Sequence, residues 1–248
     1  MEQKKYKFTN EAINFKGVIL HRIQALKDFS FIKAGDLGGW IEKEENLSQF
    51  GEAWIYENAK VYGSAKVYEH AKVYECANVH GNAKVYGSAS IYGNANIYEN
   101  AKIYDIARVY GHANIHANAE IFGLANVFDN ANVSGNAKVY ARAVVYGQSS
   151  IFENAKIHGY VEVYGNASIC ENARVCEEDD YIVFKNFWSS GRYFTWTRSD
   201  NKWHVGCFHG TGEELIKKAY KDNKKSGREY ERIVRYVESI LADEKRDK

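Results

Sequence analysis

The sequence lacks any apolar stretch near the roughly 18 residues that a membrane-spanning helix needs, which excludes a helical integral membrane protein. Residues 1–5 are polar and do not resemble the apolar core of a signal peptide, so we expect a cytoplasmic protein with no membrane partner. Its four cysteines show no CxxC spacing, which argues against a zinc site or a disulfide framework and predicts reduced thiols. Proline is absent, whereas tyrosine occurs 19 times.

The net charge is also close to zero, at +1, but basic and acidic residues are unevenly spread along the chain. Residues 53–178 carry 10 basic and 12 acidic side chains, and residues 181–248 carry 15 and 10. The C-terminal part is therefore mildly basic, which is too weak an excess to indicate nucleic-acid binding by itself.

A six-residue repeat dominates the middle of the chain. From Ile55 to Val175 every sixth residue is Val or Ile, over 21 positions, and the residue two places before it is Ala in 19 cases. Alternate side chains of a strand share a face, so the small and the β-branched residue point to one side together. A Gly or an acid follows, then most often Asn, which are residues suited to tight corners.

This period predicts a parallel β-helix over residues 53–178. A six-residue period does not fit the 3.6 residues of an α-helical turn, and an antiparallel meander would have strands of only about three residues. Coiling the chain lets each strand pair with the strand one turn away, and the small Ala allows three walls to enclose a narrow interior. With 18 residues per coil, we expect about seven coils.

Outward positions 18 residues apart form columns on three faces. Aromatic neighbours stabilise adjacent strands by roughly 0.2–1 kcal/mol per pair, so any single ring indicates strand stability alone. An unbroken column predicts an interface, and we expect the first face to form an oligomer, with a trimer favoured. That column contains Tyr56, Tyr74, Tyr92, Tyr110, Phe128, Tyr146 and Tyr164.

The third face carries cations beside aromatic rings. Such a column suits an anionic macromolecule or an acidic protein surface, although neighbouring acids could neutralise it. We predict partner binding by two sets of residues, the second of them in the aromatic C-terminal part. The first set is Lys66, Lys84, Lys102, Lys138, Lys156, Arg174, Tyr68, Tyr86 and Tyr104, and the second is Trp188 and Trp196.

The ends of the chain differ from the repeat. Residues 1–52 are predicted to cap the β-helix, with a hairpin turn at Gly17. Residues 179–248 are predicted to form a small α+β domain, with a β-hairpin and two helices. Its strands are expected at residues 181–184, 192–198 and 202–208, and its helices after capping boxes at Thr211 and Ser226.

The repeat resembles that of the hexapeptide-repeat proteins, whose coils form left-handed triangular prisms. The segment Ile32-Lys33-Ala34-Gly35-Asp36-Leu37-Gly38-Gly39-Trp40, running on to Leu47-Ser48-Gln49, also looks like the YdcK-like group. These are bacterial and phage-borne hexapeptide proteins usually labelled acetyltransferases. The resemblance covers roughly residues 20–178. It implies a mainly β fold, a left-handed parallel β-helix of about seven coils, between the N-terminal cap and the C-terminal α+β module.

The resemblance also raises the question of catalysis. Acyltransferases with this repeat use a histidine base and bind acyl-CoA between neighbouring prisms, often with the help of an inserted loop. The repeat here keeps its phase throughout, which leaves no such loop, and no spacing indicates a partner that would orient a histidine. If the protein were an acetyl-CoA-dependent acyltransferase, His80 or His116 would be the base. Cys207 and His209 share a predicted strand face, but a Cys in a strand is more often a small core residue.

We therefore predict a non-enzymatic, oligomeric β-helical scaffold without a cofactor that binds another macromolecule. Its resemblance to phage-borne proteins makes inhibition of a host system by binding one use. An acetyl-CoA-dependent acetyltransferase is the alternative, and sequestration of an anionic small molecule such as a nucleotide between subunits is a weaker one.

Overall fold

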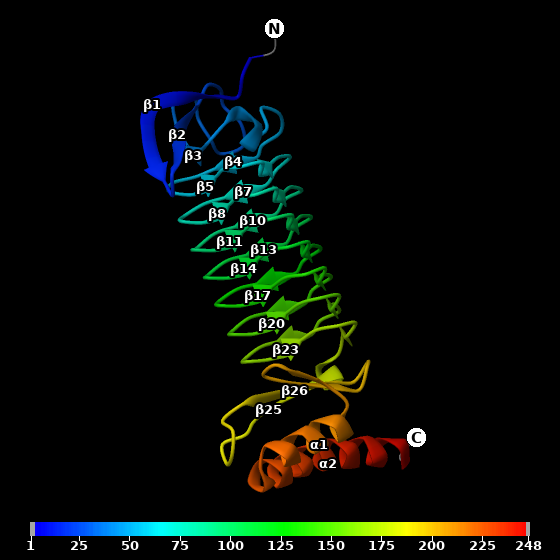
Figure 1. The fold of residues 1–248 in the computed structure, drawn as a ribbon. Coiled ribbons are helices and arrows are strands. Elements are labelled where there is room, and N and C mark those ends of the chain that lie inside the picture. Colours follow the sequence, from blue (N-terminus) through cyan, green and yellow to red (C-terminus); the bar gives the residue numbers. More distant parts are fainter. Residues whose placement is uncertain (1–2, 247–248) are drawn as a thin grey trace.

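A computed structural model describes residues 3–246 of the chain as an elongated molecule with a cap at each end (Figure 1). Its middle part is a parallel β-helix with three sheets, which we call the first, second and third faces. The first face contains β4 (Trp54–Ile55), β7 (Lys72–Val73), β10 (Ser90–Ile91), β13 (Arg108–Val109), β16 (Asn126–Val127), β19 (Val144–Val145) and β22 (Glu162–Val163). The second contains β3 (Leu37–Ile41), β5 (Lys60–Val61), β8 (Asn78–Val79), β11 (Asn96–Ile97), β14 (Asn114–Ile115), β17 (Asn132–Val133), β20 (Ser150–Ile151) and β23 (Ser168–Ile169). The third contains β6 (Lys66–Val67), β9 (Lys84–Val85), β12 (Lys102–Ile103), β15 (Glu120–Ile121), β18 (Lys138–Val139), β21 (Lys156–Ile157) and β24 (Arg174–Val175).

The mainly β fold and the stacking of coils confirm the prediction from the six-residue period. Each coil strand pairs in parallel with the strand 18 residues away, as Ile91 does with Val109. The repeated Ala and Val or Ile side chains fill the interior, and nearly all of them are completely buried. Burial of one such Val or Ile side chain contributes about 1.5–3 kcal/mol before conformational entropy is subtracted.

The stack extends further toward the N-terminus than the predicted boundary at Ala53. Trp40 and Ile41 of β3 pair in parallel with Lys60 and Val61, and Leu47 forms a parallel bridge with Val67. The second face therefore has eight parallel strands, one more than the other two faces. The pattern of Ala and Val does not reach this coil, because its interior positions are occupied by Gly38, Gly39 and larger apolar residues.

The N-terminal cap is an antiparallel hairpin of β1 (Tyr6–Phe15) and β2 (Val18–Ala25) that joins the edge of β3. Its turn is Lys16-Gly17, both with positive φ, as the prediction of a turn at Gly17 requires. Lys5 lies at the open end of the interior, where its Nζ donates to the carbonyl of Ala53 (2.8 Å). This ammonium group satisfies backbone carbonyls that no further coil covers, and its burial lowers the pKa of Lys5 to about 8.

The corners between faces place acids and glycines in the left-handed backbone region. The acids stabilise the next coil, because their carboxylates accept a hydrogen bond from the corner amide 18 residues later. Glu69 accepts from the amide of Gly87 (2.8 Å), and Glu99 accepts from that of Ala117 (2.7 Å). This bond satisfies a backbone donor that no strand pairing reaches, and it explains why acids replace glycine at these positions.

The C-terminal module consists of a four-stranded antiparallel sheet and two helices, which lie below the last coil in Figure 1. Its elements are β25 (Tyr181–Lys185), β26 (Tyr193–Thr197), β27 (Lys202–Val205), β28 (Phe208–Gly210), α1 (Gly212–Asp222) and α2 (Lys224–Arg246). The helices cover one face of the sheet and bury Phe194, Trp196 and Trp203 with Val234 and Val237. None of the described helices is long and apolar enough to cross a membrane.

Two local predictions for this module need correction. The expected strand over residues 202–208 is two strands, because the chain reverses at Gly206, which has a positive φ. The expected cap at Ser226 is also wrong, since α2 begins at Lys224 and Asn223 Oδ1 accepts the amide of Ser226 (2.8 Å). The capping box of Thr211 and Glu214 at the start of α1 is confirmed.

Candidate functional site

The aromatic columns form stacks of nearly parallel rings along the faces. On the first face, Tyr92 and Tyr110 have ring centroids 4.6 Å apart with an angle of 1° between their planes. On the third face, Tyr104 and Phe122 stack at 4.9 Å and 1°. Because adjacent strands lie about 4.8 Å apart, equal rotamers on successive coils place the rings face to face.

Stacking hides the faces of the rings and leaves their edges and hydroxyl groups at the surface. The tyrosines of the first-face column are half-buried except Tyr164, the last of them, which is 53% exposed. Burial raises the pKa of Tyr74, Tyr92 and Tyr110 of the first face, and it raises that of Tyr104 of the third face to about 12. The columns are therefore less apolar at the surface than their sequence indicates.

The second face is poor in charge and carries two of the candidate histidines. Rings of His80, Tyr98 and His116 stack at 5.2 Å and 4.8 Å. His80 Nε2 lies 3.2 Å from Asn96 Oδ1, and burial lowers the pKa of this imidazole, partly opposed by that hydrogen bond. His116 Nδ1 lies 3.7 Å from Glu99 Oε2.

The residue spacing indicated no partner for a histidine, but the structure gives His80 a hydrogen-bond partner in Asn96 and places Glu99 near His116. Asn96 and Glu99 come from the coil preceding His116 and following His80, so their proximity follows from coil stacking and not from sequence spacing.

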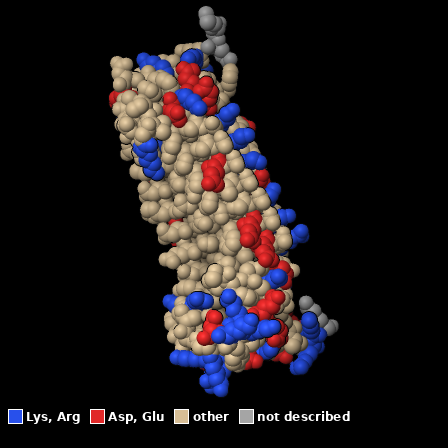
Figure 2. All heavy atoms as spheres, viewed as in Figure 1, with Lys and Arg blue, Asp and Glu red and all other residues tan. Residues whose placement is uncertain are grey.

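The space-filling view shows that charged side chains gather at the two ends of the molecule and along one edge, with a largely uncharged surface between them (Figure 2).

The basic column of the third face is divided by one acid. Glu120 pairs with Lys102 (3.0 Å) on one side and with Lys138 (2.9 Å) on the other. Burial opposes ionisation of Glu120, but the two lysine ammonium groups outweigh it and lower the pKa of the carboxyl. The group that neutralises the cations is therefore a member of the column itself and not one of the neighbouring corner acids.

The remaining cations lie toward the two ends of the column. Within residues 3–246, no carboxylate lies within 4.0 Å of the charged groups of Lys66, Lys84, Lys156 or Arg174. Lys66, Tyr68 and Lys84 line a hollow of about 340 Å³ together with Ser48 and Glu45 from the first coil. The structure thus brings one part of the predicted partner-binding set together with residues that the repeat pattern did not include.

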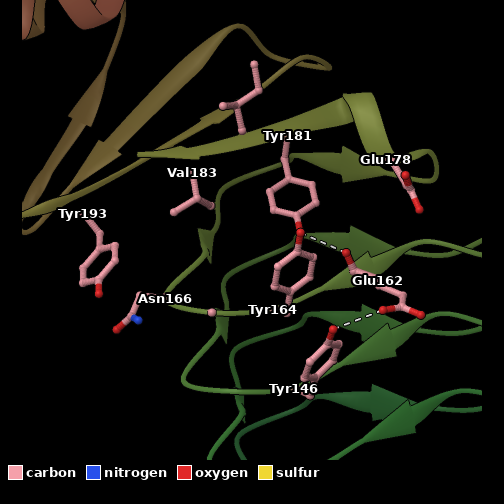
Figure 3. A pocket seen from close by; sticks show the side chains of 10 residues that line it. Tyr146, Glu162, Tyr164, Asn166, Glu178, Tyr181, Val183 and Tyr193 are labelled. Carbon is pink, nitrogen blue, oxygen red and sulfur yellow. Dashed lines mark hydrogen bonds between the residues drawn. The ribbon is translucent and has the colours of Figure 1, made fainter. Parts of the chain in front are cut away.

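A larger hollow of about 870 Å³ lies where the first face meets the C-terminal module (Figure 3). Tyr146 donates to Glu162 Oε2 (3.1 Å), and Tyr181 of the module donates to the carbonyl of Glu162 (2.9 Å). Val183 and Tyr193 line the hollow from the module side in Figure 3. Sequence reasoning missed this groove because its two walls come from different domains.

The predicted aromatic binding residues of the module have different environments. Trp188 is 65% exposed, in the loop between β25 and β26. Trp196 is 1% exposed, because its strand turns alternate side chains toward the helices, and its indole donates to Asn201 Oδ1 (2.9 Å). Trp196 therefore belongs to the core and presents no surface to a partner.

The pairing of Cys207 with His209 is also not observed. Cys207 is exposed in the turn between β27 and β28, and it lies neither on a strand nor in the core. His209 instead contacts Glu171 of the last coil.

Comparison with known proteins supports the interpretation of the repeat. No protein-family model matches the chain. A segment of 56 residues is 39% identical to the uncharacterized acetyltransferase YdcK of Escherichia coli (strain K12). The match covers 23% of this chain and 17% of that protein. Together with the stacked parallel strands, it identifies the coil region as a hexapeptide-repeat β-helix.

Proposed function

We propose that this protein is a non-enzymatic β-helical scaffold that binds an anionic macromolecular partner through the N-terminal part of its third face. The supporting observation is the hollow beside Lys66 and Lys84, whose ammonium groups have no carboxylate partner within the described residues. Tyr68 and Tyr86 stack next to them at 5.0 Å and present a fixed aromatic edge. Inhibition of a host system by binding is one use of such a surface.

The geometry of the column favours recognition of an extended anionic surface. Successive coils place Lys66 and Lys84 on directly paired strands, about 4.8 Å apart. Two cations this close repel each other in the free protein, and an anionic partner relieves that repulsion. Lys102 and Lys138 contribute less, because Glu120 already compensates their charge.

A charge-reversal experiment tests this surface. The Lys66→Glu, Lys84→Glu variant is compared with Lys72→Glu, Arg108→Glu, which changes the same charges at equivalent strand positions of the first face. Binding of fluorescent polyglutamate peptide and of heparin is measured at two salt concentrations. We expect the third-face variant to lose about tenfold or more in affinity, since one charge-assisted contact contributes about 1.5 kcal/mol or more.

The control variant should bind like the unaltered protein, and affinity should fall steeply as salt is raised. Equal affinity of both variants, without salt dependence, contradicts the proposal for the third face. Capture of partners from host lysate by the same proteins then tests whether the exposed Trp188 loop is used instead.

We further propose that the first-face column forms an oligomer interface, with a trimer as the preferred state. The stacked edges of Tyr74, Tyr92 and Tyr110 form a flat surface on which an equivalent surface can pack. Light scattering at micromolar concentration should give a mass of three chains. A monomer of 28.3 kDa contradicts this part of the proposal.

An acyl-CoA-dependent acetyltransferase is the second candidate, favoured by the name of the matched relative and by the proximity of His116 and Glu99. A carboxylate hydrogen-bonded to an imidazole can orient it as a general base, although the present separation of 3.7 Å is longer than a hydrogen bond. Against it, the coils of residues 53–178 contain no inserted loop that would help enclose a cofactor. Calorimetry with acetyl-CoA decides between the two proposals. Micromolar binding that is abolished by His116→Ala or His80→Ala would favour the acetyltransferase over the scaffold.

A further inference from the structure

The junction between the last coil and the C-terminal module contains a cluster of metal-binding side-chain types. Glu171 follows β23 at a corner of the β-helix. Asp200 lies in the turn between β26 and β27, and His209 lies on β28. Contacts between β23 and β26 bring these segments together, although they are far apart in the sequence.

The three side chains converge on one point. One ligand atom from each of Glu171, Asp200 and His209 lies within 4.8 Å of the other two. His209 Nδ1 contacts Glu171 Oε1 at 2.5 Å. Ligand atoms around one zinc ion at bond lengths of about 2.0–2.2 Å are about 3.3–3.6 Å apart, so small side-chain rotations complete the geometry.

An incompletely satisfied carboxylate is the independent indication of a ligand. Asp200 Oδ1 accepts from Thr197 Oγ1 (2.6 Å), which holds the carboxylate in place. Asp200 Oδ2 is shielded from solvent and has no hydrogen-bond partner among residues 3–246. A buried carboxylate oxygen without a donor is costly, and a bound cation would satisfy it.

A second pair of donors lies next to the cluster. His204 and His209 are directly paired across β27 and β28, so both side chains lie on the same face of that hairpin. Cys170 Sγ lies 3.5 Å from His204 Nδ1, and Cys170 directly precedes Glu171. Nitrogen and sulfur atoms around the carboxylates favour a borderline transition metal over magnesium or calcium, which prefer oxygen ligands alone.

We propose that Glu171, Asp200 and His209 bind a divalent transition-metal ion, with zinc as the best-fitting ion. The ion takes the place of the direct contact between Glu171 and His209 and bonds one oxygen of each carboxylate. One ligand comes from the β-helix and two come from the module, so the ion joins the two parts at a fixed orientation. The site is independent of the third-face binding surface.

Calorimetric titration of the tag-free, EDTA-treated full-length protein with zinc chloride tests the site. We expect one ion per chain. Loss of one ligand in His209→Ala should weaken binding at least as much as the roughly 10–100-fold that changes around a metal site produce. Asp200→Asn retains the shape and the contact with Thr197 and should weaken binding similarly. His112→Ala, at an exposed corner of the β-helix, is the matched control and should bind as the unaltered protein does.

A second readout follows from the position of the ion between two domains. Zinc should slow hydrogen exchange in β27 and β28 of the unaltered protein but not in Asp200→Asn, whose fold is checked by circular dichroism. Binding weaker than millimolar in the unaltered protein overturns the proposal. Equal binding by His209→Ala, Asp200→Asn and His112→Ala, or zinc-dependent protection that persists in Asp200→Asn, also overturns it.

Discussion

The β-helix and the C-terminal module have hydrophobic cores of opposite kinds. The β-helix repeats the same few aliphatic residues in every coil, mostly Ala followed two positions later by Val or Ile, and nearly all of them are fully buried. The module is built around a few large side chains, among them Phe194, Trp196 and Trp203. Each of them packs in an environment that is not repeated elsewhere in the module. In the β-helix stability is therefore close to a sum over coils, whereas the module depends on individual residues.

Their polar interactions differ in the same way. Along one edge of the β-helix, amide side chains form a ladder between coils, in which Asn100 donates to Asn118 (3.2 Å) and Asn118 donates to Asn136 (3.1 Å). The module uses single, specific pairs, such as Arg198 with Glu244 (2.8 Å) and with Asp179 (3.1 Å). A repeated interaction can lose one member and keep its neighbours, but a single pair cannot.

The largest expected effect is at the middle of the β-helix. Ile103→Asp places a carboxylate without a partner in a fully buried position, which costs about 4 kcal/mol or more. Urea unfolding followed by circular dichroism should show loss of the β-helix signal at a much lower midpoint. Ile103→Val, the control, should cost only about 0.5–1.5 kcal/mol. Similar midpoints for the two variants would contradict a close-packed interior.

A smaller and local effect is expected in the module. Trp203→Ala removes a large buried side chain and should cost about 3–5 kcal/mol. Because the module has a separate core, hydrogen exchange should become fast in β25–β28 and both helices while the coils remain protected. Trp188→Ala, at an exposed position, should change stability by less than about 0.5 kcal/mol. Loss of protection in the coils as well would mean that the two regions unfold as one unit.

A modest effect is expected from the amide ladder. Asn118→Ala removes two side-chain hydrogen bonds at the surface and should cost about 1 kcal/mol. Asn130→Ala at another exposed corner is the control, since no side-chain hydrogen bond of Asn130 is present within residues 3–246, and it should be close to neutral. Chemical unfolding measures both variants. Equal costs would show that the ladder contributes nothing beyond the backbone.

The smallest expected effect concerns the stacked tyrosines. Their contribution to the free energy of unfolding changes only in alkaline solution. Burial raises the pKa of Tyr104 to about 12 and also raises that of Tyr74, Tyr92 and Tyr110 above the ordinary value near 10. The unfolded chain therefore loses these protons first as the pH rises. Their contribution to stability is complete below about pH 10 and is lost as the pH rises toward the folded values.

Ultraviolet titration and urea unfolding between pH 8 and pH 11 check this expectation. The coils should become less stable above pH 10. Ionisation of all 19 tyrosines with one ordinary midpoint would contradict the protective effect of stacking.

The structure separates the sites that sequence reasoning found from those that it missed. The columns of surface residues were predictable because coil stacking brings residues that are 18 positions apart, such as Lys66 and Lys84, next to each other. The contact of His116 with Glu99 follows the same geometry but crosses between a face and a corner, and residue spacing alone did not indicate it. The neutralising role of Glu120 was not predicted, because it depends on the side-chain conformations that bring Lys102 and Lys138 to its carboxylate.

The module was less predictable because it lacks a repeat. Three strand segments and two helices were recognisable from alternating and helical patterns, but the turn at Gly206, which divides the third segment into β27 and β28, and the cap at Asn223 were not. The burial of Trp196 and the exposure of Trp188 follow from which side of the sheet the helices cover. That choice depends on contacts between α2 and the sheet, which lie far apart in the sequence.

The six-residue period by itself determined the β-helix, its interior and the three columns of surface side chains. It did so because strand alternation and the 18-residue coil leave one arrangement in which every Ala and Val is buried. Only the tertiary structure decided how the module docks on the last coil, and with it the groove near Glu162 and the cluster of Glu171, Asp200 and His209. These sites combine residues from two domains, and no local propensity specifies which surfaces of two separately folded cores meet.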